Sequence, residues 1–545
     1  MGRDAAAAVP GLSKNDAGVT KDGDNDNDNG NDGAPEGIES ATTRDDSATL
    51  GTTATASGPT KGGEGEREAK KGGWRRWFGK MNSSAEGEAL ENMGSRDGLL
   101  EGGGGEVVWK VYKRRWFGLL QLVLLNVVVS WDWLSFAPVS TTSSEYFNTS
   151  MTAINWLSTG FLFAFCVATP FTIYVLHKGG PKPAIITASV LLLIGNWIRY
   201  GGTRAKNYGV VMFGQILTGF AQPFVLSSPT HYSDLWFTNN GRVAATAVMT
   251  LANPLGGALG QLIDPFFAPN KGDIPNMVLY ISIIATVASI PSFFIPVAPP
   301  TPSSPSSTEH KLDIIPSIKT LFNSREFIMM LIPYTVYVGL FNSISSLLNQ
   351  MLSPYGFTEE EAGIAGAILI VVGLVAAAIS SPILDRSKKF LLAIKIQVPL
   401  IALAYLAFIW APPTRGVAAP YTILAILGAA SFTLLPVALE YVTELTHPVS
   451  PEVTSTILWS GGQLLGGLFI VISDALQDGP QGGPGSDVPQ NMQRALWFQA
   501  IIALVVMVPP LCLGLFGRSE QVRMRRVEAD KVYREGQRVN GGTVS

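Results

Sequence analysis

Long apolar runs dominate the chain from Trp116 onward. Windows of about 20 residues contain at most one charged side chain, and a helix of about 20 residues crosses the hydrocarbon core of a bilayer. Twelve segments follow this pattern, approximately at residues 117–139, 152–176, 184–201, 208–230, 243–268, 277–298, 326–352, 361–384, 390–411, 418–444, 453–476 and 495–516. The pattern predicts an all-α membrane protein with twelve transmembrane helices, and it excludes an ordinary soluble enzyme.

A segment rich in proline and serine, residues 299–325, separates the sixth apolar segment from the seventh. This composition is typical of a linker, so we expect two six-helix halves, residues 109–298 and 326–517. The halves share a pattern, because TAVMTLANPLGG from Thr246 and TILWSGGQLLGG from Thr456 carry threonine, an amide and Leu-Gly-Gly at the same offsets. Leu-Gly-Gly also suits close helix packing. Parallel six-helix repeats are the architecture of major facilitator carriers, in which substrate binds between the halves.

Basic residues gather on one side of the predicted spans. They are Lys110, Lys113, Arg114, Arg115, Lys178, Lys182, Arg242, Lys311, Lys319, Arg325, Arg386, Lys388, Lys389, Arg518, Arg523, Arg525 and Arg526. That side carries about three times the lysine and arginine of the other, which predicts that it is cytoplasmic. Both termini and the linker are then cytoplasmic, in a multi-pass protein of the plasma membrane or of a vacuolar or lysosomal membrane.

The ends of the chain differ from the spans in composition. Residues 1–108 are rich in Gly, Asp, Asn, Ser and Thr, as in DGDNDNDNGNDG, and have little that could form a core. We expect them to be a disordered cytoplasmic tail. Residues 518–545 are expected to be a second cytoplasmic tail.

Composition narrows the classes of function. Hydrophobic residues make up 47% of the chain and charged residues 15%, and the net charge of −3 gives no indication of nucleic-acid binding. No nucleophile, base and orienting group recur at catalytic spacing, and the four histidines lie in loops or at helix ends. We therefore expect no enzyme activity, metal site or cofactor. The expected partners are a small-molecule substrate and the lipid bilayer, with the protein as a monomer.

Polar side chains within the spans are few, and each should face a partner helix or a water-filled cavity because an unpaired polar group in hydrocarbon is costly. They are Asn126, Asp132, Asn155, Asn196, Arg199, Gln215, Gln222, Asn253, Gln261, Asp264, Asn342, Asn349, Gln350, Glu440, Glu444 and Gln463. Those of spans one, four, seven and ten line the cavity in this type of fold.

The acidic residues among them have alternative interpretations. Asp132 lies between two tryptophans in the outer half of span one, where it either forms an ion pair with Arg199 or attracts a cationic substrate or a coupling proton. Trp133 beside it either belongs to an interfacial aromatic belt or offers a face for binding a cation. Glu440 and Glu444 share one helical face, either as a gating pair or as solvated acids at a helix end.

Several strings, in order along the chain, resemble the heme and choline transporter-like family of the major facilitator superfamily, known for the feline leukaemia virus subgroup C receptor-related proteins. They are INWLS (154–158), GNWIRYG (195–201), GQILTGFAQPFVLSSPTHYSDLWF (214–237), NPLGGALG (253–260), SSLLNQM (345–351), LDRSKKF (384–390), LEYVTELTHP (439–448) and GGQLLGG (461–467). The resemblance covers roughly residues 110–517.

This resemblance implies a facilitative carrier for choline, ethanolamine or heme, and one lysosomal branch of the family is linked to proton-coupled pyridoxine transport. In the choline carriers a tryptophan of span one and a tyrosine of span seven hold the quaternary ammonium, with glutamines of spans four and eleven nearby. The matching positions here are Trp133, Gln222 and Gln463. Asn342 stands where the tyrosine is expected, and this departure removes one aromatic wall.

Two further positions bear on coupling and gating. Asp132 stands where choline carriers have an amide, and the resemblance therefore implies a cationic or proton-coupled substrate. Asp385 and Arg386 after span eight retain the acid and arginine usual in major facilitator carriers, whereas the loop after span two lacks them. Asp132, Glu440, Glu444, Asp385 and Arg386 are thus candidates for coupling or gating.

Taken together, the sequence predicts an alternating-access carrier of a small polar organic solute, choline- or ethanolamine-like or vitamin-like. The predicted substrate site consists of Trp133, Gln222, Asn342 and Gln463. The alternatives are a heme exporter of the same family and a transport-inactive membrane receptor or sensor.

Overall fold

A computed structural model describes residues 112–237, 239–300, 314–387, 390–446, 449, 451–479 and 488–512. All of them fall in one unit, Gly73–Ser545. The predicted tails at 1–108 and 518–545 lie outside the described residues.

Helices make up nearly all of the described chain, as predicted. In the first half they are α2 (Arg115–Leu134), α3 (Ser140–Phe147), α4 (Met151–Gly179), α5 (Pro181–Arg204), α6 (Tyr208–Trp236), α7 (Asn239–Phe267), η1 (Lys271–Asp273), α8 (Ile274–Ser289) and η2 (Ile290–Phe294). The linker and second half contain α9 (Ile314–Asn323), α10 (Arg325–Leu352), η4 (Ser353–Tyr355), α11 (Glu359–Ser387), α12 (Phe390–Phe408), η5 (Pro412–Thr414), α13 (Ala418–Thr446), α14 (Pro451–Ala475), α15 (Gln493–Val506) and α16 (Val508–Cys512).

Eleven of the helical segments in the described chain are long and apolar enough to span a membrane. The remaining long helix is α7, at the position of the fifth predicted span, and its described part carries Asn253, Gln261 and Asp264, which lower its hydropathy. With α7, the helices match the twelve predicted spans in order. The chain is a multi-pass membrane protein.

The predicted end of the first span is wrong. It was expected at residue 139, but α2 ends at Leu134 and the separate helix α3 follows. Pro138 explains the difference, because it has no N–H group to donate to the carbonyl oxygen of Leu134, four residues earlier, where α2 ends. The linker also contains a helix that composition did not predict, α9.

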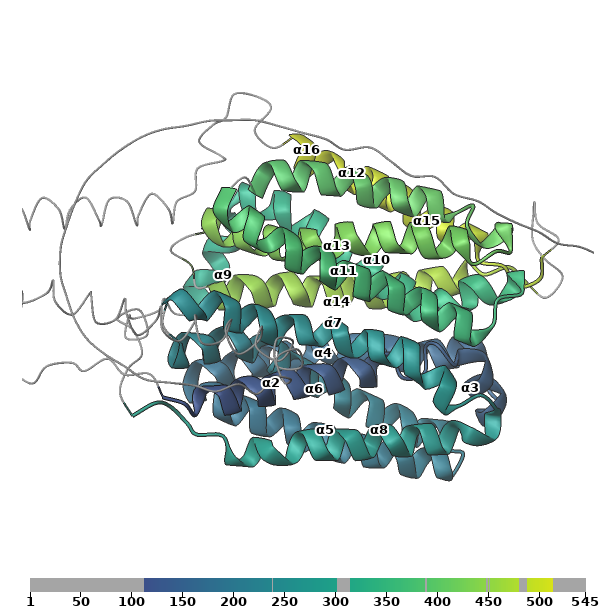
Figure 1. The fold of residues 1–545 in the computed structure, drawn as a ribbon, viewed down its shortest axis with the longest axis horizontal. Helices are drawn as coiled ribbons and strands as arrows, with labels where there is room; N and C mark the ends of the chain where they lie inside the picture. Colours follow the sequence, from purple (N-terminus) through teal and green to yellow (C-terminus); the bar gives the residue numbers. More distant parts are fainter. Residues whose placement is uncertain are drawn as a thin grey trace, which may run out of the picture. The chain divides into compact units, whose positions relative to one another are not determined.

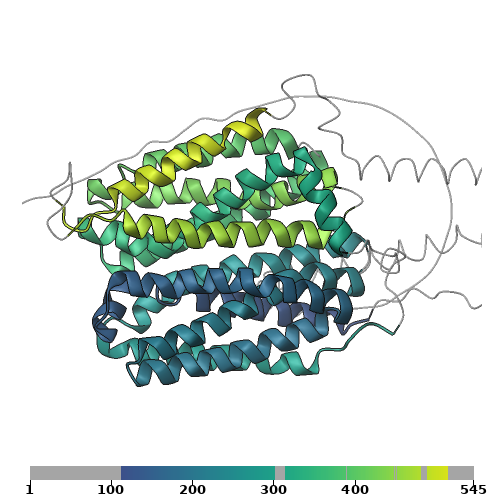
Figure 2. The ribbon, with the colours of Figure 1, turned by 180° about the vertical axis from the view of Figure 1, so that it is seen from behind.

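The helices of the two halves form two adjacent groups, shown in purple to teal and in green to yellow in Figures 1 and 2. The groups meet where α7 packs against α11 and where α4 packs against α14. The α3 end, as we call it, is the end of the bundle at which α2 finishes and α3 lies; the α9 end is the opposite one, where α10 begins after α9.

The Leu-Gly-Gly motif of each half packs against the first long helix of that half. A Cβ atom at Gly256 in α7 would lie 1.9 Å from the carbonyl oxygen of Val127 in α2. The matching Gly466 in α14 would place a Cβ 2.7 Å from Nδ2 of Asn342 in α10. Both distances are too short for real atoms, so only glycine allows these helices to approach. The shared packing supports the internal repeat.

Replacing Gly256 by alanine should destabilise the protein by about 1–3 kcal/mol, because the new methyl group forces α7 away from the α2 backbone. The measurement is the midpoint of heat-induced loss of the monodisperse protein in detergent. Gly201→Ala in α5 is the control, since no atom lies within 4 Å of its Cβ position and alanine favours a helix. Equal midpoints for the two variants would contradict the proposed packing role.

Candidate functional site

The four residues predicted to bind substrate lie on four helices, and all are buried. Trp133 is on α2 and Gln222 on α6, while Asn342 is on α10 and Gln463 on α14. The Asn342 Nδ2 atom donates a hydrogen bond of 2.9 Å to the Gln463 Oε1 atom. The two predicted amides of the second half therefore bind each other directly.

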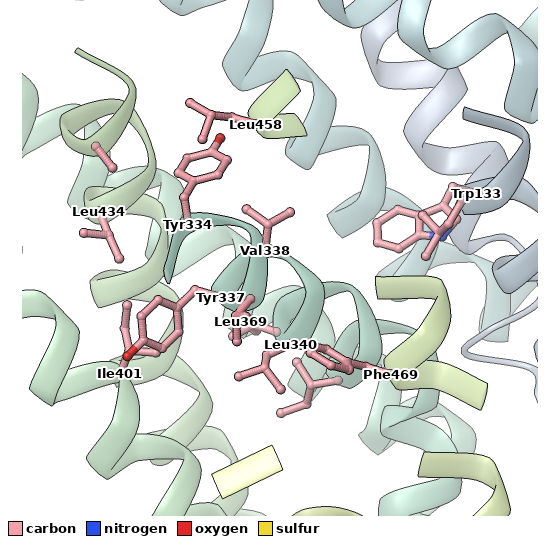
Figure 3. Packing of buried hydrophobic residues seen from close by; sticks show 14 of the residues in the cluster. Trp133, Tyr334, Tyr337, Val338, Leu340, Leu369, Ile401, Leu434, Leu458 and Phe469 are labelled. Carbon is pink, nitrogen blue, oxygen red and sulfur yellow. The ribbon is translucent and has the colours of Figure 1, made fainter. Parts of the chain in front are cut away.

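The two predicted residues of the first half keep polar atoms without partners. The Nε1 atom of Trp133 and the Oε1 atom of Gln222 are buried, and neither makes a hydrogen bond within the described part of the chain. Their helices pack against each other. Figure 3 shows the Trp133 ring extending from α2 toward the side on which Val338 of α10 lies. The first half thus offers a donor, an acceptor and an aromatic face.

Local sequence explains how α6 presents Gln222. Helix α6 continues through Pro223, which has no N–H group to donate to the carbonyl oxygen of Gly219. Gly219 also lets α6 approach α4 closely, because a Cβ there would lie 2.7 Å from the carbonyl oxygen of Phe161. Gln222 is therefore held on a helix that is seated tightly within its half.

Tyr334 is a buried polar aromatic residue that the sequence did not single out. It lies on α10, and among the described atoms its hydroxyl has no hydrogen-bond partner. Its ring meets that of Trp459 in α14 edge to face, with centroids 6.0 Å apart. The family resemblance assigns the span-seven aromatic position to Asn342, so it gives no indication of Tyr334. The Tyr334–Trp459 pair therefore lies about two helical turns from Asn342, toward the α9 end.

Asp132 forms the ion pair that was one of its two predicted roles. Its Oδ1 atom lies 2.8 Å from Nη1 of Arg199 in α5, and both side chains are fully buried. Asn196 donates to its Oδ2 atom at 2.6 Å. Arg199 also donates to the hydroxyl of Ser135. Both carboxylate oxygens are thus engaged within the first half, and a role of Asp132 in coupling stays a prediction.

A carboxylate of the second half binds α3 of the first half. The Oε1 atom of Glu359, at the start of α11, accepts hydrogen bonds from the backbone N–H groups of Thr141 at 2.9 Å and Thr142 at 3.1 Å. These N–H groups belong to the first turn of α3, where helix geometry leaves donors unpaired and favours negative charge. Asn349 of α10 donates to both Ser140 and Glu359. We call this group the Glu359 clamp.

Two more residues of the first half, Asn155 and Gln261, join the halves at the α3 end. Asn155 of α4 donates to Oδ1 of Asp474 in α14 at 2.6 Å and to Oε1 of Gln350 in α10 at 3.2 Å. Gln261 of α7 donates to the backbone carbonyl of Ser345 in α10 at 2.7 Å. The α3 end is therefore closed by polar contacts in this structure.

The sequence predicts Asn349 and Gln350 of span seven as lining the cavity, and Asn155 and Gln261 only as polar residues within spans. It missed Glu359 and Asp474 because both lie at the ends of predicted spans, where an acid normally faces water. The other gating candidates, Glu440 and Glu444 of α13 and Asp385 and Arg386 of α11, have side chains outside the described residues. A groove of about 250 Å³ between α11 and α12 is mainly apolar and includes none of the predicted site residues.

Comparison with known proteins settles the family. A profile of the Major Facilitator Superfamily matches residues 122–471, more than half of the chain. The chain belongs to the major facilitator superfamily. Two solved structures share this fold: a bacterial homologue of the human lysosomal transporter Spinster, inward-facing and unoccupied, and a D-xylose-proton symporter. Their TM-scores are 0.57 and 0.55, each is 13% identical, and each match covers 97% of the solved chain and 74% or 73% of this one.

Curated relatives of this superfamily member agree with the resemblance found in the motifs. Solute carrier family 49 member A3 of Danio rerio is 30% identical over 430 residues, which cover 77% of this chain and 90% of that protein. The choline/ethanolamine transporter FLVCR2 of Homo sapiens is 27% identical over 400 residues, covering 70% of this chain and 75% of that protein. The predicted family of feline leukaemia virus subgroup C receptor-related proteins is confirmed, and the chain is a transporter of small solutes.

Proposed function

We propose that this member of the superfamily carries a small organic cation, choline- or ethanolamine-like, or a vitamin-like solute, by alternating access. The observation that carries the proposal is the pair of buried unpartnered atoms on Trp133 and Gln222. A buried polar atom without a partner costs about 1–3 kcal/mol, so such atoms in a native fold call for a ligand or water to bind them. Relatives named choline/ethanolamine transporters support the same substrate class.

The chemistry of the two side chains suits such a solute. An indole face attracts a quaternary or primary ammonium, and the attraction is strongest where water is excluded. The Gln222 Oε1 atom offers an acceptor for a hydroxyl or ammonium proton. Asn342 and Gln463 of the second half form a bonded amide pair, and a substrate hydroxyl can exchange hydrogen bonds with this pair. Tyr334 and Trp459 supply aromatic surface nearer the α9 end.

The structure also supports a direction for the two ends. Those of the predicted cytoplasmic basic residues whose side chains the structure describes lie at the α9 end: Lys113, Arg114, Arg115, Lys178, Lys182, Lys319 and Arg325. The α9 end then faces the cytoplasm and the α3 end faces the outside or the lumen. Closure of the α3 end by the Glu359 clamp then corresponds to an inward-facing carrier.

Binding tests this proposal directly. Purified protein should gain thermal stability with choline, ethanolamine or pyridoxine, because a ligand that binds the native state raises its apparent stability. Trp133→Ala should weaken binding of the active cation by about tenfold or more, from loss of the cation–π contact in a water-excluded site. The matched control is Trp410→Ala, since Trp410 follows α12 and its side chain is 55% exposed, whereas Trp133 is buried.

Flux into proteoliposomes separates the alternatives. Uptake of the stabilising cation supports the proposed carrier, and stabilisation by heme alone with heme efflux supports a heme exporter. Retained binding without flux indicates a receptor or sensor. Equal affinities of Trp133→Ala and Trp410→Ala would reject Trp133 as a substrate-binding residue.

A further inference from the structure

Asp264, near the α3 end of α7, is a fully buried acid with one unpaired oxygen. Its Oδ1 atom accepts a hydrogen bond of 2.9 Å from the Trp131 indole of α2. Its Oδ2 atom is buried and has no hydrogen-bond partner in the part of the chain that the structure describes. The atom points back along its own helix, because a Cβ on Gly260 would lie 3.5 Å from it. A single hydrogen bond from an indole N–H offsets only a small part of the free-energy cost of burying a negative charge.

The charges around Asp264 do not balance in the ionised form. The guanidinium of Arg199 and the carboxylate of Asp132 both act electrostatically on Asp264. Arg199, however, uses its Nη atoms on Asp132, Asn196 and Ser135, and no described cation forms an ion pair with Asp264. One guanidinium therefore faces two acids, and its single positive charge is matched by Asp132.

Other ionisable groups on the elements packed against α7 are engaged elsewhere or lie at the surface. Near the α3 end, in the described residues, they are Glu359 and Glu361 of α11, which bind α3 and the Thr358 backbone, exposed Glu360 of α11, and Lys271 and Asp273 of η1, which lie exposed and half-exposed beyond the end of α7. At the opposite, α9 end of the helices that pack against α7 lie Arg115 of α2 and His231, Tyr232 and Asp234 of α6, and the Tyr232 hydroxyl donates to the Arg115 carbonyl. Tyr280 of α8 is exposed and packs on Phe267, while Tyr208 at the start of α6 donates to the Ala153 carbonyl. The described groups form no cluster of three or more metal-ligating side chains with Asp264, so a proton is the cation that suits this site.

Asp264 is coupled to closure of the α3 end through its own helix. One turn earlier, Gln261 reaches across the halves to the Ser345 carbonyl. Pro265, the next residue, lies 3.1 Å from the Cβ position of Gly363 in α11, and the Gln261 carbonyl oxygen lies only 2.3 Å from it. Separation of α7 from α11 would therefore break the contacts of Gln261 and Pro265, on either side of Asp264 in α7, and bring water to that part of the helix.

We propose that Asp264 is a proton-binding site: its carboxylate takes up one proton to become a neutral carboxylic acid as the α3 end closes, and releases that proton as the end opens. The proposal rests on the alternating-access function proposed above. Since the closed state binds the proton more strongly than the open state, acidification favours closure. The closed-to-open ratio should rise by at most about tenfold for each pH unit of acidification in the range where the two states differ in bound protons.

A distance measurement without substrate tests the proposal. Cysteines replace the exposed Glu145 of α3 and Glu360 of α11, after the native Cys166 and Cys512 are changed to serine, and carry spin labels in the full chain in lipid nanodiscs. The short-distance population should grow as the pH is lowered from about 8 to about 5, a range in which a buried carboxyl can titrate. Asp264→Asn mimics the neutral acid and should stay closed at every pH.

Two further variants make the result specific. Asp273→Asn, at a half-exposed acid of the same end, should keep the wild-type pH dependence. Trp131→Phe removes the one donor that stabilises the Asp264 carboxylate, so the midpoint of closure should move up by about one pH unit. If Asp264→Asn does not fold, the pH midpoint of closure in Trp131→Phe tests whether Asp264 binds the proton.

The proposal is overturned if the wild-type distances do not change with pH, or if Asp264→Asn keeps the wild-type pH dependence. An unchanged midpoint in Trp131→Phe would also overturn it. Because no solute is present, these outcomes are independent of whether the protein carries choline-like solutes. Loss of solute flux with intact pH-dependent closure would reject the proposed substrate and leave the proton site standing.

Discussion

Arg199→Met should destabilise the protein by about 3–5 kcal/mol, because it leaves the carboxylate of Asp132 buried without its counterion. Both side chains are 0% exposed. The substitution also removes the donor to Ser135 and the guanidinium that lies 5.3 Å from the centroid of the Phe136 ring. Asn196 alone then remains to solvate the acid through its side chain. The expected result is a fall of about 5 °C or more in the midpoint of thermal unfolding in detergent.

The double variant Asp132→Asn with Arg199→Met should recover most of this loss. It removes both charges, and replacement of a buried ion pair by neutral groups is often close to neutral for stability. Arg494→Met is the matched control: Arg494 pairs with Asp478 but is 52% exposed, so its loss should cost at most about 1 kcal/mol. If Arg199→Met behaved like Arg494→Met, the buried pair would not be a major source of stability.

The Asp132–Arg199 pair shows how far sequence could go. Both residues are charged and lie at similar depth in predicted spans, so the sequence predicts an ion pair as one of two roles for Asp132. The deciding fact is that Asn196 and Arg199 engage both oxygens of Asp132, and this depends on how α2 and α5 are rotated about their axes. Hydropathy and residue order predict the number of helices but not their rotation.

The clamp at the α3 end could not be read from the sequence. Glu359 opens the run EEE after a glycine-containing turn, which is the usual pattern of solvated acids at a helix start. Its partners Thr141 and Thr142 lie more than 200 residues away, in α3, a short helix that lies outside all twelve predicted spans. Only the packing of the two halves brings the acid to the first turn of α3.

The predicted substrate site comes from motif matching and remains a prediction as a binding site. The match to the family strings assigns the span-eleven amide to Gln463, and it shows Asn342 at the position where choline carriers have a tyrosine. It could not show that these two amides bind each other, nor that Tyr334 supplies an aromatic ring elsewhere on the same helix. The sequence likewise identifies Asp264 only as an intramembrane acid, because a missing partner is visible only in three dimensions.

Glu359→Ala should shift the protein strongly toward opening at the α3 end. The substitution removes the acceptor for the N–H groups of Thr141 and Thr142 and for the Thr142 hydroxyl, which donates at 2.5 Å. The closed state alone contains these bonds. Loss of hydrogen bonds to a charged acceptor is worth about 3 kcal/mol. The closed-to-open ratio should therefore fall by roughly 100-fold.

Accessibility of a buried cysteine at the interface measures this shift. Ser345→Cys lies 1% exposed beside the Gln261 contact and should react with a membrane-impermeant maleimide only when the α3 end opens. In that background Glu359→Ala should speed the reaction strongly, whereas Glu360→Ala, at the exposed neighbouring acid, should leave the rate unchanged. Glu359→Gln keeps an acceptor oxygen but loses the charge that favours the α3 N-terminus, so its rate should lie between the two. Equal rates in Glu359→Ala and Glu360→Ala would show that the clamp does not hold the α3 end closed.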